Sequence, residues 1–464
     1  MTGTGLPGHL GEPSEGARRM NGTWDAHDGT RLPAFERHPL RAAVLGEMHA
    51  RPFRPISSPR LMLHYAFTVD AAAACLDRLW FAELCGSHGV TGPGEGDRSH
   101  VLPIAGGTLR WEQHAEFITY TFDAAPIGEQ PFGPVPAGHP FGASFRAPGP
   151  MLAAARLDVI EADRFDADPA DPASLARWFD AASLTALQSE EGQAVAVTDF
   201  RQDGDGLTRI LLINRGMGDS QTGALAQRLI EVETYRTLAL LGLPMAIRLS
   251  PDVRRIEEEL VALTNRMRDA ADTNGNRDLL QKLSDLAADL EAGAASSAYR
   301  FGASRAYHDI VQARLGTIDE APVAGLLAMS SFLARRLAPA MRTIQSVEDR
   351  QINLSRKLSR ATTLLRTRVD VDMEIQNSAL LDSMNRRARM QLRLQQTVEG
   401  LSVAAVSYYV VGLVGYLAKG LKETGIPMPD PGLVAGAAVP LVVLAIWWTV
   451  RRIRASHAEP DDKH

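Results

Sequence analysis

The sequence predicts an α+β protein made of a cytosolic mixed α/β domain, a long-helix bundle or stalk, and a C-terminal two-helix transmembrane hairpin. Strand-like and helical stretches alternate up to about residue 245, helical spacing then continues almost unbroken, and two uncharged apolar segments lie near the C-terminus. The predicted parts are a disordered tail (1–35), the α/β domain (36–245), a helical stalk domain (246–397), the hairpin (398–452) and a cytosolic tail (453–464).

Composition excludes several classes of protein. The 464 residues are 45% apolar and 22% charged, which is ordinary for a globular protein and excludes wholesale disorder. The net charge of −6 argues against a chain that binds nucleic acid electrostatically. Cys75 and Cys85 exclude a disulfide scaffold and an all-cysteine zinc site, and they suit a reducing compartment.

Two apolar segments predict the membrane hairpin. Residues 401–418 and 433–450 are each 18 residues long and uncharged, and a helix of that length spans about 27 Å. Arginines lie outside both outer ends, and Trp447 and Trp448 suit an aromatic belt, so we expect two helices in the inner membrane with both termini cytoplasmic. The alternative is a pair of buried core helices. Residues 1–35 contain no apolar core of a signal peptide.

The N-terminal half predicts strands and helices in a recurring order. Two successive β-α-β-β units suggest a duplicated domain. The expected strands are 61–69, 101–104, 108–122, 152–160, 194–200 and 208–214, the expected helices are 71–84, 172–187 and 219–241, and 123–150 is an expected loop.

The second half predicts helices only. Three are expected at 252–267, 277–292 and 297–315, followed by one helical tract over 323–418 that contains a single proline, Pro339. One chain cannot cover so long a helix, so we expect a bundle or a homo-oligomeric stalk. Residues 335–393 hold 13 Lys or Arg against 6 Asp or Glu. That excess suits either positive-inside topology or contact with lipid headgroups.

Three stretches carry a resemblance to a known family. Residues 47–53 (EMHARPF), residues 111–117 (WEQHAEF) and the tract that begins RQINLSRKLSRATTLL at Arg350 resemble an uncharacterised bacterial family of membrane-anchored proteins with a domain of unknown function. The resemblance covers nearly the whole chain after residue 36. It implies a membrane anchor and no known activity.

The layout also resembles, more distantly, that of the CorA magnesium and cobalt transporters, and residues 385–415 are similar to their stalk and pore helix. That family ends its pore helix with Gly-Met-Asn, where this chain has Gly415-Tyr416-Leu417, followed by Lys419 and Lys422. The resemblance implies an oligomer and, as an alternative function, a divergent divalent-cation channel. Mitochondrial relatives that lack the signature are regarded as anchors.

Two alternating polar trios are the candidate site in the cytosolic part. On an extended strand, residues two apart share a face, so each trio would present its side chains together. Glu–His pairing suits a divalent metal site, another binding site or general acid–base catalysis, and a structural ion-pair network is the alternative. We expect the two trios to meet, and His64 could join them. The trios are Glu47, His49 and Arg51, and Glu112, His114 and Glu116.

The first apolar segment carries a stripe of small and hydroxyl-bearing residues at helical spacing, which favours close helix packing. It would pack on the second helix or on a neighbouring subunit, or Glu399 would ring a pore entrance. The candidates are Glu399, Ser402, Ala405, Tyr409, Gly412, Gly415 and Tyr416. The sequence thus predicts an oligomeric, membrane-anchored scaffold or sensor, with the channel and a membrane-tethered enzyme as alternatives; no nucleophile elbow, phosphate loop or zinc-protease motif is present.

Overall fold

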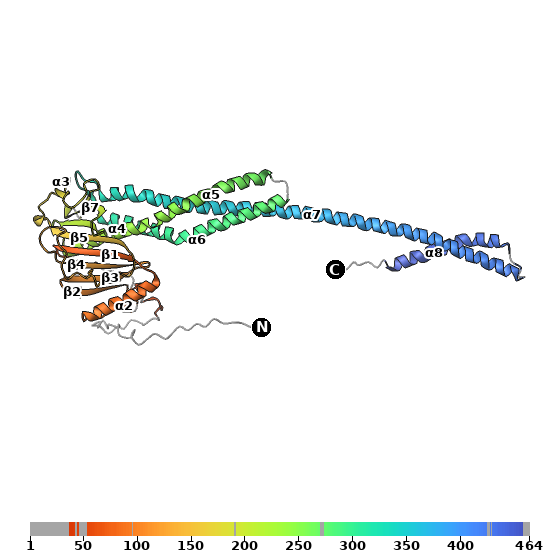
Figure 1. Cartoon of the computed structure of the whole chain (residues 1–464), viewed down its shortest axis with the longest axis horizontal. Coiled ribbons are helices and arrows are strands. Elements are labelled where there is room, and N and C mark those ends of the chain that lie inside the picture. Colours follow the sequence, from red (N-terminus) through yellow and green to blue (C-terminus); the bar gives the residue numbers. More distant parts are fainter. Residues whose placement is uncertain are drawn as a thin grey trace, which may run out of the picture. The chain divides into compact units, whose positions relative to one another are not determined.

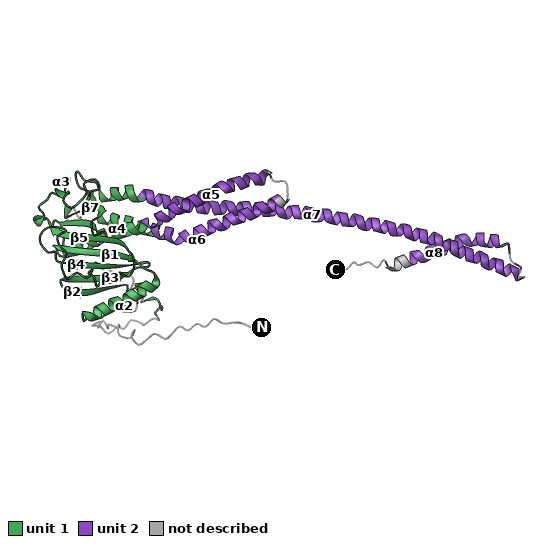
Figure 2. Cartoon of the chain, viewed as in Figure 1, with its two compact units in different colours: residues 1–239, 306–337 green, residues 240–305, 338–464 purple. Residues whose placement is uncertain are grey.

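The computed structural model describes residues 37–41, 44–45, 53–94, 96–189, 192–269, 273–424, 427 and 429–457. The predicted tail over 1–35 lies outside this range, as do residues 458–464 of the predicted C-terminal tail. The chain forms two compact units (Figure 2). Unit 1 comprises Met1–Ala239 and Ala306–Leu337, and unit 2 comprises Leu240–Arg305 and Ala338–His464. Unit 1, which contains the sheet, therefore also includes a later segment, Ala306–Leu337, that its position in the sequence alone would not assign to it.

Unit 1 is built on one nine-stranded sheet (Figure 1), with the strand order β2-β3-β4-β1-β5-β8-β7-β6-β9. Its strands are β1 (Arg60–Thr68), β2 (Ser99–Ile104), β3 (Gly107–Gln113), β4 (Phe117–Ala124), β5 (Met151–Glu161), β6 (Thr185–Ser189), β7 (Ala194–Gln202), β8 (Thr208–Asn214) and β9 (Ala321–Pro322).

The two halves of the sheet repeat one order of elements but not one topology. A helix follows the first strand of each half, α2 (Ala71–Ser87) after β1, and the short η2 (Ala162–Arg164) and α3 (Pro172–Leu175) after β5. The strand order is mirrored about the β1–β5 pair. However, β1 pairs with β4 antiparallel, whereas β5 pairs with β8 parallel. The predicted duplication therefore extends to the element order alone.

One face of the sheet packs its aromatic side chains against α2. Phe81 of α2 stacks on Trp111 of β3, with ring centroids 5.6 Å apart. Asp77 is buried beneath them and accepts hydrogen bonds from Trp111 Nε1 and Tyr120 Oη, both at 2.8 Å. Burial raises the pKa of Asp77, and these two hydrogen bonds oppose the rise. A buried carboxylate thus ties α2 to two strands.

The opposite face of the sheet carries several buried polar side chains among apolar ones and is covered by α4 (Asp219–Leu240). Thr208 of β8 donates to Glu233 of α4 at 2.8 Å, and Glu233 also pairs with Arg236 at 2.6 Å. Thr234 of α4 lies 3.0 Å from the ring of His64 on β1. Because each of these groups is buried or partly buried, the contact between α4 and the sheet is held by hydrogen bonds as well as by apolar packing.

Two sequence-predicted elements of unit 1 are wrong. The strand predicted over 108–122 is two strands, because the chain reverses at 114–116, where the His114 amide donates to the Phe117 carbonyl. The helix predicted over 172–187 ends at Leu175, and residues 185–189 form β6 against β7. Its Ala and Leu favour helix locally, but Ala186 and Leu187 are fully buried in the sheet, so tertiary packing overrides propensity.

Unit 2 is helical. Its elements are α5 (Gly242–Asp269), α6 (Thr273–Ile318), α7 (Met329–Glu423) and α8 (Pro431–His457), of which α6 ends and α7 begins in unit 1. Ion pairs join α5 to α6 (Arg255–Asp289, 3.1 Å) and α5 to α7 (Arg350–Glu257, 2.5 Å). The predicted bundle and the long tract are confirmed, whereas the helices predicted at 277–292 and 297–315 are one helix.

Two described helices, α7 and Pro431–Arg452 of α8, are long and apolar enough to cross a membrane. They lie against each other at their loop ends. A Cβ on Gly415 of α7 would lie 3.6 Å from Ala435 Cβ of α8, and Lys422 pairs with Asp430 at 3.5 Å. Ser407 and Ala418 are the buried residues of the α7 segment over 401–418. These contacts fit a hairpin.

Replacing Asp77 with Ala should destabilise unit 1 by about 2–4 kcal/mol, because the buried donors of Trp111 and Tyr120 would lose their acceptor. Denaturant unfolding of the full chain, followed by tryptophan fluorescence, measures the change. Asp70→Ala is the matched control on the same helix, since Asp70 only caps the exposed start of α2, and it should cost about 1 kcal/mol. Equal losses in the two variants would contradict the structural role of Asp77.

Candidate functional site

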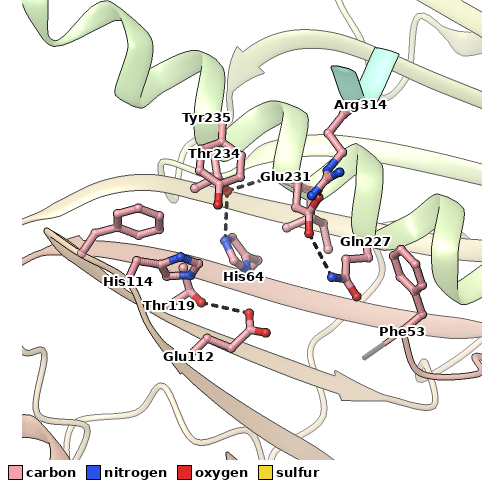
Figure 3. A pocket seen from close by; sticks show the side chains of 12 residues that line it. Phe53, His64, Glu112, His114, Thr119, Gln227, Glu231, Thr234, Tyr235 and Arg314 are labelled. Carbon is pink, nitrogen blue, oxygen red and sulfur yellow. Dashed lines mark hydrogen bonds and ion pairs between the residues drawn. The ribbon is translucent and has the colours of Figure 1, made fainter. Parts of the chain in front are cut away.

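A cavity of about 170 Å³ lies in unit 1 between the face of the sheet that α4 covers and helices α4 and α6 (Figure 3). Strands β1, β3 and β4 supply its floor, and α4 and α6 supply the opposite wall. The lining residues are Phe53, His64, Glu112, His114, Phe117, Thr119, Gln227, Ile230, Glu231, Thr234, Tyr235 and Arg314.

Glu112 is the charged residue of the floor. It pairs across the β3–β4 ladder with Thr119, whose hydroxyl donates to Glu112 Oε2 at 3.3 Å. Its other oxygen, Oε1, is buried and accepts no hydrogen bond from the described residues. The guanidinium nitrogen Nη1 of Arg110 lies 4.0 Å from Oε1, beyond hydrogen-bond reach. A carboxylate oxygen removed from water without a donor is costly, so Oε1 is a place for a ligand's donor.

His64 has both ring nitrogens occupied, which fixes its tautomer. The Thr234 hydroxyl donates to the Ile230 carbonyl at 2.9 Å, so it accepts from His64 Nε2–H at 3.0 Å. Nδ1 is then unprotonated and accepts from the Thr121 hydroxyl at 2.8 Å. Burial, and secondly the charge of Arg110, lower the pKa of His64 to about 3. His64 is therefore a neutral bridge between sheet and helix at physiological pH, where it has no free lone pair for base catalysis.

The helix wall is organised by an amide and an ion pair. Gln227 and Glu231 lie one turn apart on α4, and Gln227 Nε2 donates to Glu231 Oε1 at 2.9 Å. Glu231 also pairs with Arg314 of α6. The amide oxygen of Gln227 accepts from Arg110 Nη1 at 3.4 Å. The polar groups on this wall are therefore held in place by contacts within unit 1.

Aromatic rings close two sides of the cavity. His114 stacks on Phe117 with ring centroids 4.0 Å apart, and Phe117 meets Tyr235 edge to face at 6.1 Å. Phe53, which is half exposed, lies on another side. Its position follows from Gly223 of α4, where any Cβ would overlap the Arg54 carbonyl oxygen. Only glycine lets residues 54–56 run this close to α4.

The structure brings some of the predicted site residues together. Glu112 and His114 both line the cavity, but Glu116 does not, and it accepts from the Tyr307 hydroxyl at 2.6 Å instead. The three do not share a strand face, contrary to the prediction, because β3 ends at Gln113. Glu47, His49 and Arg51 lie outside the described residues, although Phe53, from the same segment, reaches the cavity. Within the described ranges, no group of three or more His, Cys, Asp or Glu is placed to hold a metal ion.

Sequence reasoning missed the helix wall. Gln227 and Glu231 carry only the signal of an i,i+4 polar pair, which is common on solvated helices. Arg314 is distant in sequence from every other lining residue, and it reaches the cavity because α6 ends in unit 1. No local sequence pattern marks this end of α6 as part of unit 1.

The predicted stripe on α7 is placed away from α8. Tyr409 and Tyr416 are 70% and 78% exposed, and a Cβ on Gly412 would meet open space. Gly415 instead faces Ala435 of α8. Ser402 and Ala405 are exposed and Glu399 is partly exposed. The stripe therefore does not pack on the second helix, whereas Gly415 does.

The buried, neutral His64 makes stability depend on pH. In the unfolded chain its pKa is near 6.5 and in the folded chain about 3, so its stabilising contribution is complete above pH 6.5 and falls as pH drops toward 3. The loss is about 2 kcal/mol at pH 5. His64→Asn keeps one donor and one acceptor but does not titrate. It should lose less stability between pH 8 and pH 5 in denaturant unfolding of the full chain. An identical loss in both proteins would contradict this.

The comparisons with known proteins agree with the family resemblance. A family model described as a protein of unknown function (DUF3422) matches residues 36–457. No curated protein and no solved structure matches the chain. The predicted resemblance to a family with a domain of unknown function is thus confirmed, and the CorA-like layout stays a prediction. The chain belongs to the DUF3422 family.

Proposed function

We propose that this protein is a homo-oligomeric sensor anchored in the inner membrane, with both termini in the cytoplasm and a small-ligand site in unit 1. The observation that best supports this proposal is that α7 is one continuous helix. This one helix of 95 residues begins among the residues of unit 1 and runs on into an apolar segment of membrane-spanning length. Glu320 fixes its start by accepting from the amides of Met329 and Ser330 at 2.6 and 3.0 Å.

The middle of α7 supports assembly. Between residues 374 and 402 nearly every side chain is exposed within the described chain. Such a helix is marginal in water without a partner, and its exposed apolar side chains favour burial. Copies anchored in the same membrane run parallel and at high local concentration, so a second copy is the natural cover. The large apolar residues are Ile375, Leu380, Leu381, Met384, Met390, Leu392, Leu394 and Val398.

The cavity supports sensing over the two alternatives from the sequence. An enzyme that used His64 as a base is disfavoured, because hydroxyl groups occupy both of its ring nitrogens. A cation channel is disfavoured by Lys419 and Lys422, which follow the position of the CorA signature; Lys422 also pairs with Asp430. A preformed pocket in which a buried carboxylate oxygen, Glu112 Oε1, accepts no hydrogen bond from the described residues suits reversible ligand binding.

The proposed topology predicts that a cysteine placed at Thr424, in the loop between α7 and α8, reacts with an impermeant thiol reagent added to intact cells. Arginines outside both outer ends of the hairpin favour a cytoplasmic location for those ends. The native Cys75, exposed on α2, is an internal control that should react only after permeabilisation. Labelling of Cys75, or of a cysteine at Ser456, in intact cells while Thr424→Cys stays protected would reverse the topology.

The proposed assembly predicts that Gly412→Leu weakens self-association at least ten-fold, measured by native mass spectrometry of the full chain in mild detergent. The leucine would project from the stripe, where a single chain leaves open space. Gly436→Leu, at an equally open position on α8, is the matched control and should assemble normally. A monomeric wild-type chain, or equal assembly of Gly412→Leu and wild type, would contradict the stripe as an interface.

A further inference from the structure

We infer that the cavity of unit 1 binds a small organic cation, an ammonium or guanidinium group on a compact apolar body, with its N–H donated to Glu112 Oε1. The inference rests on the small-ligand site of the proposed function and adds the class of ligand. Glu112 lies on the floor of the cavity between Thr119 and the side chains of α4 (Figure 3).

The hydrogen-bond inventory of Glu112 requires a donor. Glu112 is only 9% exposed, Thr119 satisfies Oε2, and no described group donates to Oε1. An ionised carboxylate accepts on both oxygens, and an N–H from a cation gives the shorter and stronger kind of hydrogen bond. A ligand carboxylate would bring a second acceptor to the same place and leave Oε1 without a donor.

The charges that line the cavity favour a cation. Glu231 is already paired with Arg314, and His64 is neutral. Gln227 uses its amide N–H on Glu231 and its amide oxygen on Arg110. Glu112 is therefore a carboxylate of the cavity that forms no ion pair with another lining residue. Its nearby cation, Arg110, does not line the cavity and lies 4.0 Å away. Arg110 Nη1 donates to the amide oxygen of Gln227 and stays 4.0 Å from Glu112 Oε1, so a ligand cation within hydrogen-bond distance would be the closer countercharge for Glu112.

The aromatic sides and the volume define the rest of the ligand. Phe117, Tyr235 and Phe53 offer ring surfaces that attract a cation and also pack against an apolar body. The cavity volume of about 170 Å³ is close to that of an apolar cavity known to hold benzene, about 150 Å³. The ligand is thus a molecule of about six to eight non-hydrogen atoms, larger than a metal ion and smaller than a nucleotide.

Calorimetric titration of the full chain in lipid nanodiscs tests the inference with three probes that share a phenyl ring and differ in charge. Benzylamine is the cation, benzyl alcohol the neutral isostere and benzoate the anion. Benzylamine should bind saturably and at least ten-fold more tightly than benzyl alcohol, a difference of about 1.4 kcal/mol. Benzoate should not bind. Tighter binding of benzoate, equal binding of benzylamine and benzyl alcohol, or no binding of any probe would overturn the inference.

Two variants locate the effect. Glu112→Gln keeps the shape but removes the charge and should weaken benzylamine binding at least ten-fold, whereas Glu116→Gln, just outside the cavity, should bind as wild type does. Thermal unfolding checks that each variant is folded. If Glu112→Gln is unfolded, Phe117→Leu serves instead and should weaken benzylamine binding at least three-fold.

Unchanged benzylamine binding in a folded Glu112→Gln chain would overturn the assignment to Glu112. The proposed function is judged separately. Tight benzoate binding would keep a ligand site and reject only the cation, whereas a reversed topology or a monomeric chain would reject the anchored assembly without touching the pocket.

Discussion

The bridge from Thr121 through His64 to Thr234 is the interaction on which the site depends. It joins β4, β1 and α4 through two hydrogen bonds to a buried, neutral imidazole ring. A polar bridge in such a place tolerates little sliding, because any shift would leave buried donors and acceptors unpaired. Helix α4 is therefore held in one register over the sheet. That register sets Gln227 and Glu231 of α4 opposite Glu112 of β3 and leaves a cavity between them.

The part of the cavity wall that α6 supplies depends on residues 306–337, which belong to unit 1 although residues 240–305 do not. Helix α6 ends against unit 1, where Arg314 pairs with Glu231 and Ser189 donates to the Ile318 carbonyl at 2.7 Å. Strand β9 then adds to the edge of the sheet beside β6, and Glu320 caps α7 a few residues later. The end of α6 and the start of α7 are thus fixed to the same sheet. The helix that carries the first apolar segment of membrane-spanning length starts in the unit that contains the cavity, an arrangement that suits the proposed sensor.

The spacing of apolar residues predicted the strands and helices that the local sequence determines. Alternating apolar residues placed β1, β5, β7 and β8, and unbroken helical spacing placed α7 and the two apolar segments. The hairpin turn at 114–116 was missed because His-Ala-Glu contains no glycine, proline or asparagine to mark it. Strand β6 was missed because its alanine and leucine favour helix by local propensity, whereas their burial in the sheet stabilises the strand. Glu112 and His114 were found from their chemistry, whereas Arg314 depends on a long-range contact that spacing does not encode.

Among the described residues, Glu112 Oε1 and the exposed middle of α7 both lack partners of the kind that folding normally supplies, and they need partners of different kinds. Glu112 Oε1 is a single buried acceptor in a cavity of fixed shape, so a small molecule with one donor satisfies it. The middle of α7 exposes apolar side chains along several turns, and only a surface of similar length covers them. A small ligand cannot fill the second need, and another helix cannot enter the cavity. The proposed cation in unit 1 and the proposed second copy along α7 would therefore occupy separate places and would not compete with each other.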